Sequence, residues 1–525
     1  MNRYIAATAA LDPVEATRLG IDGLDHALPD LTHDGIMRAQ AATDDWLTQF
    51  EAISDEGLSP DDQIDRDLVL SHLRGLLVMR DWNSWRRNPT VYALPPLEGV
   101  FTLLLHRSLP EAELIEAVCA RLRGAAAVLD AGIANLDPAL ASPIFVDRAA
   151  DACRAAIDYC RTLVPAELGG NAALVEAGEA AARAYESFGA FLIELRATAS
   201  GAYAIGAERY SALLEQKEML GYDVHEMLAR GRAAYEELSA ELSRRAHVMR
   251  GTDDWAKVIQ ELSEDHPATP EAMRDEYEAW TARARTFLVE RELVTLPIGE
   301  RCVVEPAPTF QRAISAVAFY DSPQMFKASN TGYFFVPVPP DGASEEEITK
   351  RLASNSFSMI PTVSVHEAYP GHHWHFVQML GARPIRKVLG SSYFIEGWGL
   401  YSEIMMMEQG FYDDPRHELG VLDARIFRAA RIIVDTSLHT GAMDFEQAVD
   451  FMVATGVAEP MARAEVARYC SWPTQASSYF TGSLEIERMR ARWFAEGRGD
   501  LRAFHDRITA SGALPIALCE RAVFG

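Results

Sequence analysis

The sequence has little of several features that direct a chain to particular protein classes. It has only six cysteines in 525 residues, and none form a CxxC pair, so neither a disulfide framework nor a thiolate metal site is expected. No run of about 18 apolar residues is present, and no transmembrane helix is therefore expected. Basic residues are scarce as well, because 49 Lys and Arg face 76 Asp and Glu, a net charge of −27. This balance speaks against nucleic acid and anionic membranes as partners.

Several catalytic motifs are also missing. The sequence has no Walker loop, no GxGxxG unit followed by an acidic residue, and no GxSxG elbow, so phosphoryl transfer, dinucleotide redox chemistry and serine hydrolysis have no support. Near the N-terminus, Asp12 and Glu15 interrupt a short apolar run too early for a signal-peptide core. We therefore expect a cytoplasmic protein, and nothing in the sequence indicates its oligomeric state.

The composition, 49% hydrophobic and 24% charged, is that of a folded globular protein, and the length exceeds what one core usually supports. Apolar residues recur at helical spacing up to about residue 290, and again after residue 345. Between them, β-branched and aromatic segments broken by prolines indicate short strands. We predict a mainly α, two-lobed fold with a deep central cleft. A helical lobe spans 1–290, and a second lobe spans 291–525 with a small antiparallel sheet in 291–340 and, in 355–410, the helices that carry the candidate site described below. The two lobes should form one integrated unit.

The segment 366–375, HEAYPGHHWH, holds four of the 14 histidines. In the HExxH motif of metallopeptidases, two histidines one helical turn apart bind one zinc, and the glutamate after the first is the general base. Here Pro370 and Gly371 separate the histidines further, and in an unbroken helix His366 and His372 would lie about 240° apart. Proline removes a backbone hydrogen bond and glycine adopts unusual angles, so a two-residue bulge would bring His372 back to the metal. His373 remains the alternative ligand.

A zinc ion with two histidine ligands needs a third protein ligand and an open position for water. The segment 393–403, YFIEGWGLYSE, places two glutamates on one helix face, and Glu396 lies 24 residues after His372. We predict that Glu396 is the third ligand, that Glu403 orients a histidine, and that Glu367 is the general base. One zinc per chain is expected.

Two later segments carry further candidate residues. Arg428, Arg431, Asp435 and His439 recur on one face of a predicted helix. They form either a surface ladder of ion pairs or a substrate site, in which His439 donates to the substrate carbonyl and an arginine binds a substrate carboxylate. The segment 473–482 places Gln475 and Tyr479 beside small polar residues, and Tyr479 is either a core tyrosine or a catalytic one.

The combination of HEAYPGHH and EGWGLYSE resembles the bacterial family known as domain of unknown function 885. Its members look like relatives of zinc peptidases of the thimet-oligopeptidase and Taq-carboxypeptidase type. The resemblance extends through DRDLVL, NPTVY, IGAERY, NTGYFFVP, RAARIIVDTSLHTG and TQASSYFTG, and so covers most of the chain. It implies a metallopeptidase-like fold, with Glu396 and Glu403 at the positions of the glutamate ligand and of a second glutamate seven residues later. It also implies that Tyr479 stabilises the oxyanion.

These observations predict a gluzincin-like zinc metallopeptidase that hydrolyses short peptides with a metal-activated water. Two alternatives stay open: a zinc hydrolase of non-peptide amides or amino-acid conjugates, and a catalytically inactive zinc-containing binding protein. The predicted residues fall into three groups: the metal ligands His366, His372 and Glu396; the catalytic residues Glu367, Tyr479 and His439; and the supporting or substrate residues Glu403, His373, Arg431, Asp435 and Gln475. The choice between endo- and exo-cleavage is open.

Overall fold

The computed structural model describes residues 1–312, 317–340 and 342–525. The chain forms two compact units: the first comprises 1–57, 72–205 and 324–328, and the second comprises 58–71, 206–323 and 329–525. The division therefore lies at 205/206, and the boundary expected at residue 290 falls inside the second unit. The reason is packing, because the helices between 206 and 290 lie against the segments that carry the candidate site.

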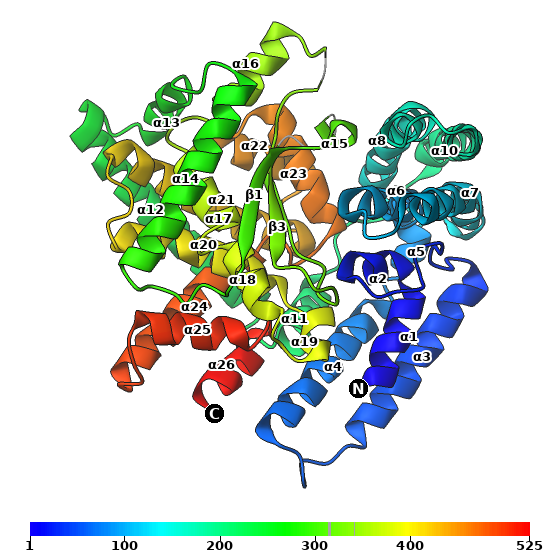
Figure 1. Ribbon diagram of the computed structural model, residues 1–525, viewed down its shortest axis with the longest axis horizontal. Coiled ribbons are helices and arrows are strands. Elements are labelled where there is room, and N and C mark those ends of the chain that lie inside the picture. Colours follow the sequence, from blue (N-terminus) through cyan, green and yellow to red (C-terminus); the bar gives the residue numbers. More distant parts are fainter. Residues whose placement is uncertain (313–316, 341) are drawn as a thin grey trace. The chain divides into compact units, whose positions relative to one another are not determined.

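The first unit is helical (Figure 1). Its long helices pack on one another through small and aliphatic residues, and Arg121 is fully buried among them. Arg121 donates hydrogen bonds to the carbonyls of Gly99 (2.6 Å) and Ala27 (3.1 Å) and to the hydroxyl of Thr17 (2.6 Å). The elements are α1 (Asn2–Leu11), α2 (Pro13–Leu19), α3 (His33–Glu51), part of α4 (Pro60–Arg80), α5 (Ser84–Arg87), α6 (Thr90–His106), α7 (Glu111–Asn135), α8 (Pro143–Asp158), the π-helix η1 (Tyr159–Leu163), α9 (Val164–Glu167) and α10 (Ala172–Thr198).

The second unit combines helices with a small sheet, so the prediction of a mainly α fold is confirmed (Figure 1). Within the described residues no helix is both long and apolar enough to cross a membrane. Besides the start of α4 the elements are α11 (Ala207–Gln216), α12 (Val224–Arg250), α13 (Trp255–Ser263), α14 (Pro270–Glu290), β1 (Arg301–Pro306), α15 (Thr309–Arg312), β2 (Phe319–Asp321), β3 (Thr331–Val336), α16 (Glu345–Ala353), α17 (Ile360–Glu367), α18 (His372–Met379), α19 (Pro384–Val388), α20 (Ser392–Glu408), α21 (Pro415–Thr440), α22 (Phe445–Ala454), α23 (Glu459–Ser471), α24 (Ser478–Ala495), α25 (Leu501–Ala510) and α26 (Ile516–Phe524).

The sheet is mixed, and the prediction of an antiparallel sheet was wrong. Its strand order is β1-β3-β2. β1 pairs in parallel with β3, with Arg301 opposite Thr331, whereas β2 pairs antiparallel with β3, with Phe319 opposite Phe335. Parallel neighbours need a long connection, and the segment between β1 and β3 is long enough because it also contains α15 and β2.

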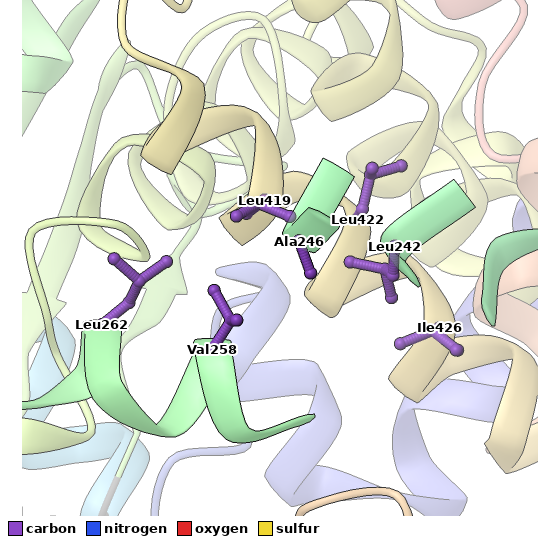
Figure 2. Close-up of a cluster of buried hydrophobic side chains, with 7 residues drawn as sticks. All are labelled: Leu242, Ala246, Val258, Leu262, Leu419, Leu422 and Ile426. Carbon is purple, nitrogen blue, oxygen red and sulfur yellow. The ribbon is translucent and has the colours of Figure 1, made fainter. Parts of the chain in front are cut away.

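Helix α21 is fixed in the second unit by a hydrophobic cluster. Side chains from α12, α13 and α21 point toward one another (Figure 2). All seven are buried: Leu242, Ala246, Val258, Leu262, Leu419, Leu422 and Ile426. Since burial of each large aliphatic side chain contributes roughly 1.5–3 kcal/mol, this cluster stabilises the packing of α21 against α12 and α13. The metallopeptidase-like arrangement and the deep cleft stay predictions.

Candidate metal centre

The histidine motif spans the end of one helix and the start of the next. α17 ends at Glu367 and α18 begins at His372, so the two-residue bulge within one helix was wrong. The connection contains a cis peptide bond before Pro370, and the Gly371 N–H donates to the carbonyl of Val365 at 3.1 Å. A Cβ on Gly371 would lie 1.9 Å from the carbonyl oxygen of His366. Only glycine therefore allows the chain to fold back so closely on the end of α17.

The fold nevertheless brings the three predicted ligands together. The Nε2 of His366 lies 3.8 Å from Oε2 of Glu396, and the Nε2 of His372 lies 3.6 Å from the same oxygen. The ligand atoms of all three residues lie within 4.8 Å of one another. In a tetrahedral zinc site with bonds of about 2.0–2.1 Å, the ligand atoms are roughly 3.3 Å apart. The two separations from Glu396, 3.8 and 3.6 Å, are slightly longer than this spacing.

Helix α20 positions both Glu396 and the residues that hold His366. Gly399, about one turn beyond Glu396, makes room for the imidazole of His366, because a Cβ there would lie 2.6 Å from its Cε1. Glu403 then faces the other ring nitrogen, with Oε1 2.7 Å from Nδ1 of His366. The hydroxyl of Thr362 donates to the second oxygen of Glu403 at 2.7 Å. This carboxylate fixes the ring with Nε2 toward Glu396, the arrangement seen for histidine ligands of metals.

The donor set fits a divalent cation. Burial alone would raise the pKa of Glu396, but His366 and His372 hold it well below its usual range, so the carboxylate is ionised. Burial lowers the pKa of His366, yet Glu396 and Glu403 together raise it to about 9. No hydrogen bond joins the two Nε2 atoms to Glu396 within the described residues, because both distances exceed 3.5 Å. Two imidazoles and one carboxylate that face one another without hydrogen bonds are the ligands zinc prefers.

Glu367 follows His366 at the end of α17 and is half-buried. Burial raises the pKa of its carboxyl, and the neighbouring His372, His366 and Arg428 only partly oppose this. A carboxylate of raised pKa beside a metal site has the properties of a general base.

His373 points to a different set of partners. Its Nε2 lies 3.0 Å from Glu300, and its Nδ1 lies 2.9 Å from the hydroxyl of Tyr320. Glu300 also accepts hydrogen bonds from Tyr369 and Arg285. Of the two histidines that the sequence left open, His372 is therefore the one that faces Glu396. Sequence reasoning missed Glu300 and Tyr320, since neither lies in a motif.

Tyr479 is held by a closed loop of contacts. Its hydroxyl accepts a hydrogen bond from Gln475 at 3.3 Å, and the guanidinium of Arg431 lies over its ring at 4.6 Å. Arg431 donates a hydrogen bond to Glu465 (2.9 Å), which also accepts one from Arg468. Arg468 in turn donates a hydrogen bond to Gln475, which closes the loop. Burial and the charge of Glu396 raise the pKa of Tyr479, while Arg431 and Arg468 oppose the rise. Tyr479 therefore interacts electrostatically with Glu396, one of the three candidate ligands.

Asp435 and His439 belong to a fully buried polar group on α21. Asp435 accepts from the hydroxyl of Tyr210 (2.8 Å) and the N–H of Ser477 (3.3 Å). His439 lies 3.0 Å from the carbonyl of Tyr469 and 3.6 Å from Asp435. Within the part of the chain that the structure describes, these contacts do not reach the three ligands. The catalytic role of His439 stays a prediction.

Comparison with solved structures shows the same fold in two bacterial proteins. A candidate lipoprotein of unknown function from Shewanella oneidensis aligns over 99% of this chain and 98% of its own, with a TM-score of 0.79 and 19% identity. A candidate lipoprotein from Colwellia psychrerythraea aligns over 98% of this chain and 96% of its own, with a TM-score of 0.81 and 19% identity. At this identity the likeness concerns the fold alone.

Comparison of sequences leads to a family. None of the proteins with curated descriptions matches the chain. One family model matches residues 13–523, nearly the whole length. The chain therefore belongs to the family described as bacterial protein of unknown function (DUF885).

Proposed function

We propose that this protein is a zinc-dependent hydrolase that cleaves peptide bonds of short peptides. The observation that carries the proposal is the convergence of His366, His372 and Glu396, whose ligand atoms lie within 4.8 Å of one another. A structural zinc site has four protein ligands, whereas three leave a position for water and substrate. The half-buried Glu367 beside His366 supports a catalytic rather than a structural site.

In this proposal, different residues of the chain contribute to different steps of amide hydrolysis. His366, His372 and Glu396 would hold the zinc ion, which when bound would lower the pKa of a water molecule toward about 7 and polarise the substrate carbonyl. Glu367 accepts the proton of the attacking water and transfers it to the leaving amine. Tyr479 donates its phenolic proton in a hydrogen bond to the oxyanion that forms at the carbonyl. Glu403 keeps His366 in the orientation that binds metal.

The test is hydrolysis of a peptide mixture by the zinc-loaded protein and by Glu367→Gln. Glutamine keeps the shape of the side chain but accepts no proton, so zinc content should stay the same while kcat falls by about 10²–10⁴. Wild-type turnover in the zinc-loaded variant would refute the role of Glu367. A wild-type protein that cleaves non-peptide amides but no peptide would move the proposal to that substrate class, since the same residues serve both reactions.

A further inference from the structure

Arg428 on α21 has hydrogen-bond donors without a partner among the described residues. The chain carries 76 acidic and 49 basic residues, yet no carboxylate of the described residues lies within 4.0 Å of this guanidinium. Its Nη1 donates to the carbonyl of Ala424 at 3.1 Å. Its Nε is buried and has no hydrogen-bond partner, and Nη2 makes no hydrogen bond within the described chain either. The Nε–Nη2 edge therefore makes no hydrogen bond with the described residues.

The neighbouring arginines of the same helix are engaged. Arg425, about one turn before, donates to Ser483 (3.3 Å) and Glu487 (3.0 Å). Arg431, about one turn after, donates to Tyr469 (3.0 Å) and Glu465 (2.9 Å). Since a buried donor without a partner is unfavourable, such groups usually have a partner in the working protein. Of the two arginines that the sequence offered for a substrate carboxylate, Arg428 is the one with free donors.

Helix α21 lies beside the segment that leads into the candidate metal centre. A Cβ on Gly420 of this helix would lie 2.0 Å from the carbonyl oxygen of Ser358, two residues before α17 begins. The guanidinium of Arg428 lies 5.8 Å from the ring of Phe427, whose other neighbour is Arg431 at 4.5 Å, and Arg431 lies over Tyr479. The positive charge of Arg428 also helps to lower the pKa values of Glu367 and Glu403. The hydrophobic cluster of Figure 2 holds this part of α21 in place.

We propose that Arg428 binds a carboxylate of the substrate through Nε and Nη2. This inference rests on the proposed function and names its substrate class: peptides with a free carboxylate close to the cleaved bond. The guanidinium edge matches the two oxygens of a carboxylate and makes two parallel, charge-assisted hydrogen bonds. A doubly charged phosphate fits less well, because three acidic groups, Glu367, Glu403 and Asp423, already interact electrostatically with Arg428.

The experiment compares pairs of tripeptides that differ only in one carboxylate. Ala-Ala-Ala and its C-terminal amide test the terminal carboxylate, and the amides of Ala-Ala-Glu and Ala-Ala-Gln test an acidic side chain. In at least one pair, kcat/KM for the wild type should favour the carboxylate by about 10- to 100-fold, as expected for paired hydrogen bonds to a charged group. Arg428→Gln should remove this preference. Arg428→Lys keeps the positive charge but lacks the paired N–H donors of the guanidinium. This variant should therefore lose most of the preference for the carboxylate substrate.

The control is Arg416→Gln on the same helix, since Arg416 is already paired with Asp414 and Asp265 (2.7 Å each). Its preference should equal that of the wild type. A carboxylate preference that survives in Arg428→Gln would overturn the proposal. An equal fall for acid and amide in Arg428→Gln would also overturn it, because Arg428 would then only balance the acidic charge.

Binding separates this inference from the proposed function. Calorimetry of the same peptides with the zinc-loaded Glu367→Gln protein measures affinity without turnover. Tighter binding of the acid than of the amide, lost on adding Arg428→Gln, would support the assignment of Arg428 even if the wild type hydrolysed no peptide. Equal affinities for acid and amide in both pairs would overturn it even if peptides are cleaved.

Discussion

A single methyl group on Gly399 should disturb the metal centre. In the structure a Cβ at this position would lie 2.6 Å from Cε1 and 2.8 Å from both nitrogens of the His366 ring. Carbon atoms prefer a separation of about 3.5–4.0 Å, so the ring must move by roughly 1 Å. It cannot move freely, because Glu403 holds Nδ1 at 2.7 Å. Metal–ligand distances tolerate only about 0.2 Å.

We therefore expect Gly399→Ala to lower zinc affinity by at least 10- to 100-fold, the usual effect of disturbing a ligand's orientation. The fold should suffer less. Overpacking lowers the free energy of unfolding by about 1–3 kcal/mol, whereas replacing a helical glycine with alanine raises it by up to about 1 kcal/mol. Competition with a chromogenic chelator measures the affinity, and urea denaturation of the metal-free proteins measures the stability.

The matched control is Gly189→Ala in α10, where the added Cβ would come no closer than 3.9 Å to Cys153. This variant should keep its zinc affinity and gain slightly in stability. Unchanged zinc affinity in Gly399→Ala would refute the placement of His366 against α20. A similar loss in both variants would mean that the effect is not local to the metal centre.

Three further predictions concern other parts of the structure. Glu403→Gln should weaken zinc binding by about 10- to 100-fold in the same competition assay, because an amide holds Nδ1 of His366 less strongly than a carboxylate; undiminished affinity would argue against this contact. Arg121→Met should lower the free energy of unfolding by roughly 2–4 kcal/mol, since it leaves buried carbonyls of the first unit without donors; a loss below about 0.5 kcal/mol in urea denaturation would contradict the role of this arginine. Burial raises the pKa of Asp435 from 3.8 to about 7. Between these two pH values the folded state keeps a proton that the unfolded state has lost. The stability of the wild type therefore falls as the pH rises from about 4 to about 7. Asp435→Asn should therefore gain roughly 3 kcal/mol relative to the wild type between pH 4 and pH 8, and a pH-independent difference would contradict this reasoning.

The cluster of His366, His372 and Glu396 could be predicted from the sequence because the residues lie in two short motifs. His366, Glu367 and His372 lie in one short motif, and Glu396 follows within a second motif on a predicted helix. The contact of Glu403 with a histidine could be predicted from its position two turns after Glu396. The path of the backbone could not be predicted from the motif. Pro370 and Gly371 lie between the end of one helix and the start of another, instead of forming a bulge within a single helix.

Contacts between distant segments could not be predicted in this way. The partner of His373 is Glu300, 73 residues earlier, and no periodicity or spacing connects the two. The parallel pairing of β1 with β3 depends on how the residues between them fold, which the composition of the strands does not specify. The helices between 206 and 290 look like those before them in sequence, yet α12 and α14 pack on α21 and α17 of the second unit.

The most direct test of the account is the zinc content of the purified protein, measured by mass spectrometry after zinc loading and dialysis. We predict about one zinc per chain in the wild type, and a near-complete loss in both His372→Ala and Glu396→Ala. His373→Ala should retain the metal, because His373 binds Glu300 and Tyr320 instead. A wild type without zinc, or a His372→Ala variant that retains a full equivalent, would contradict the central claim.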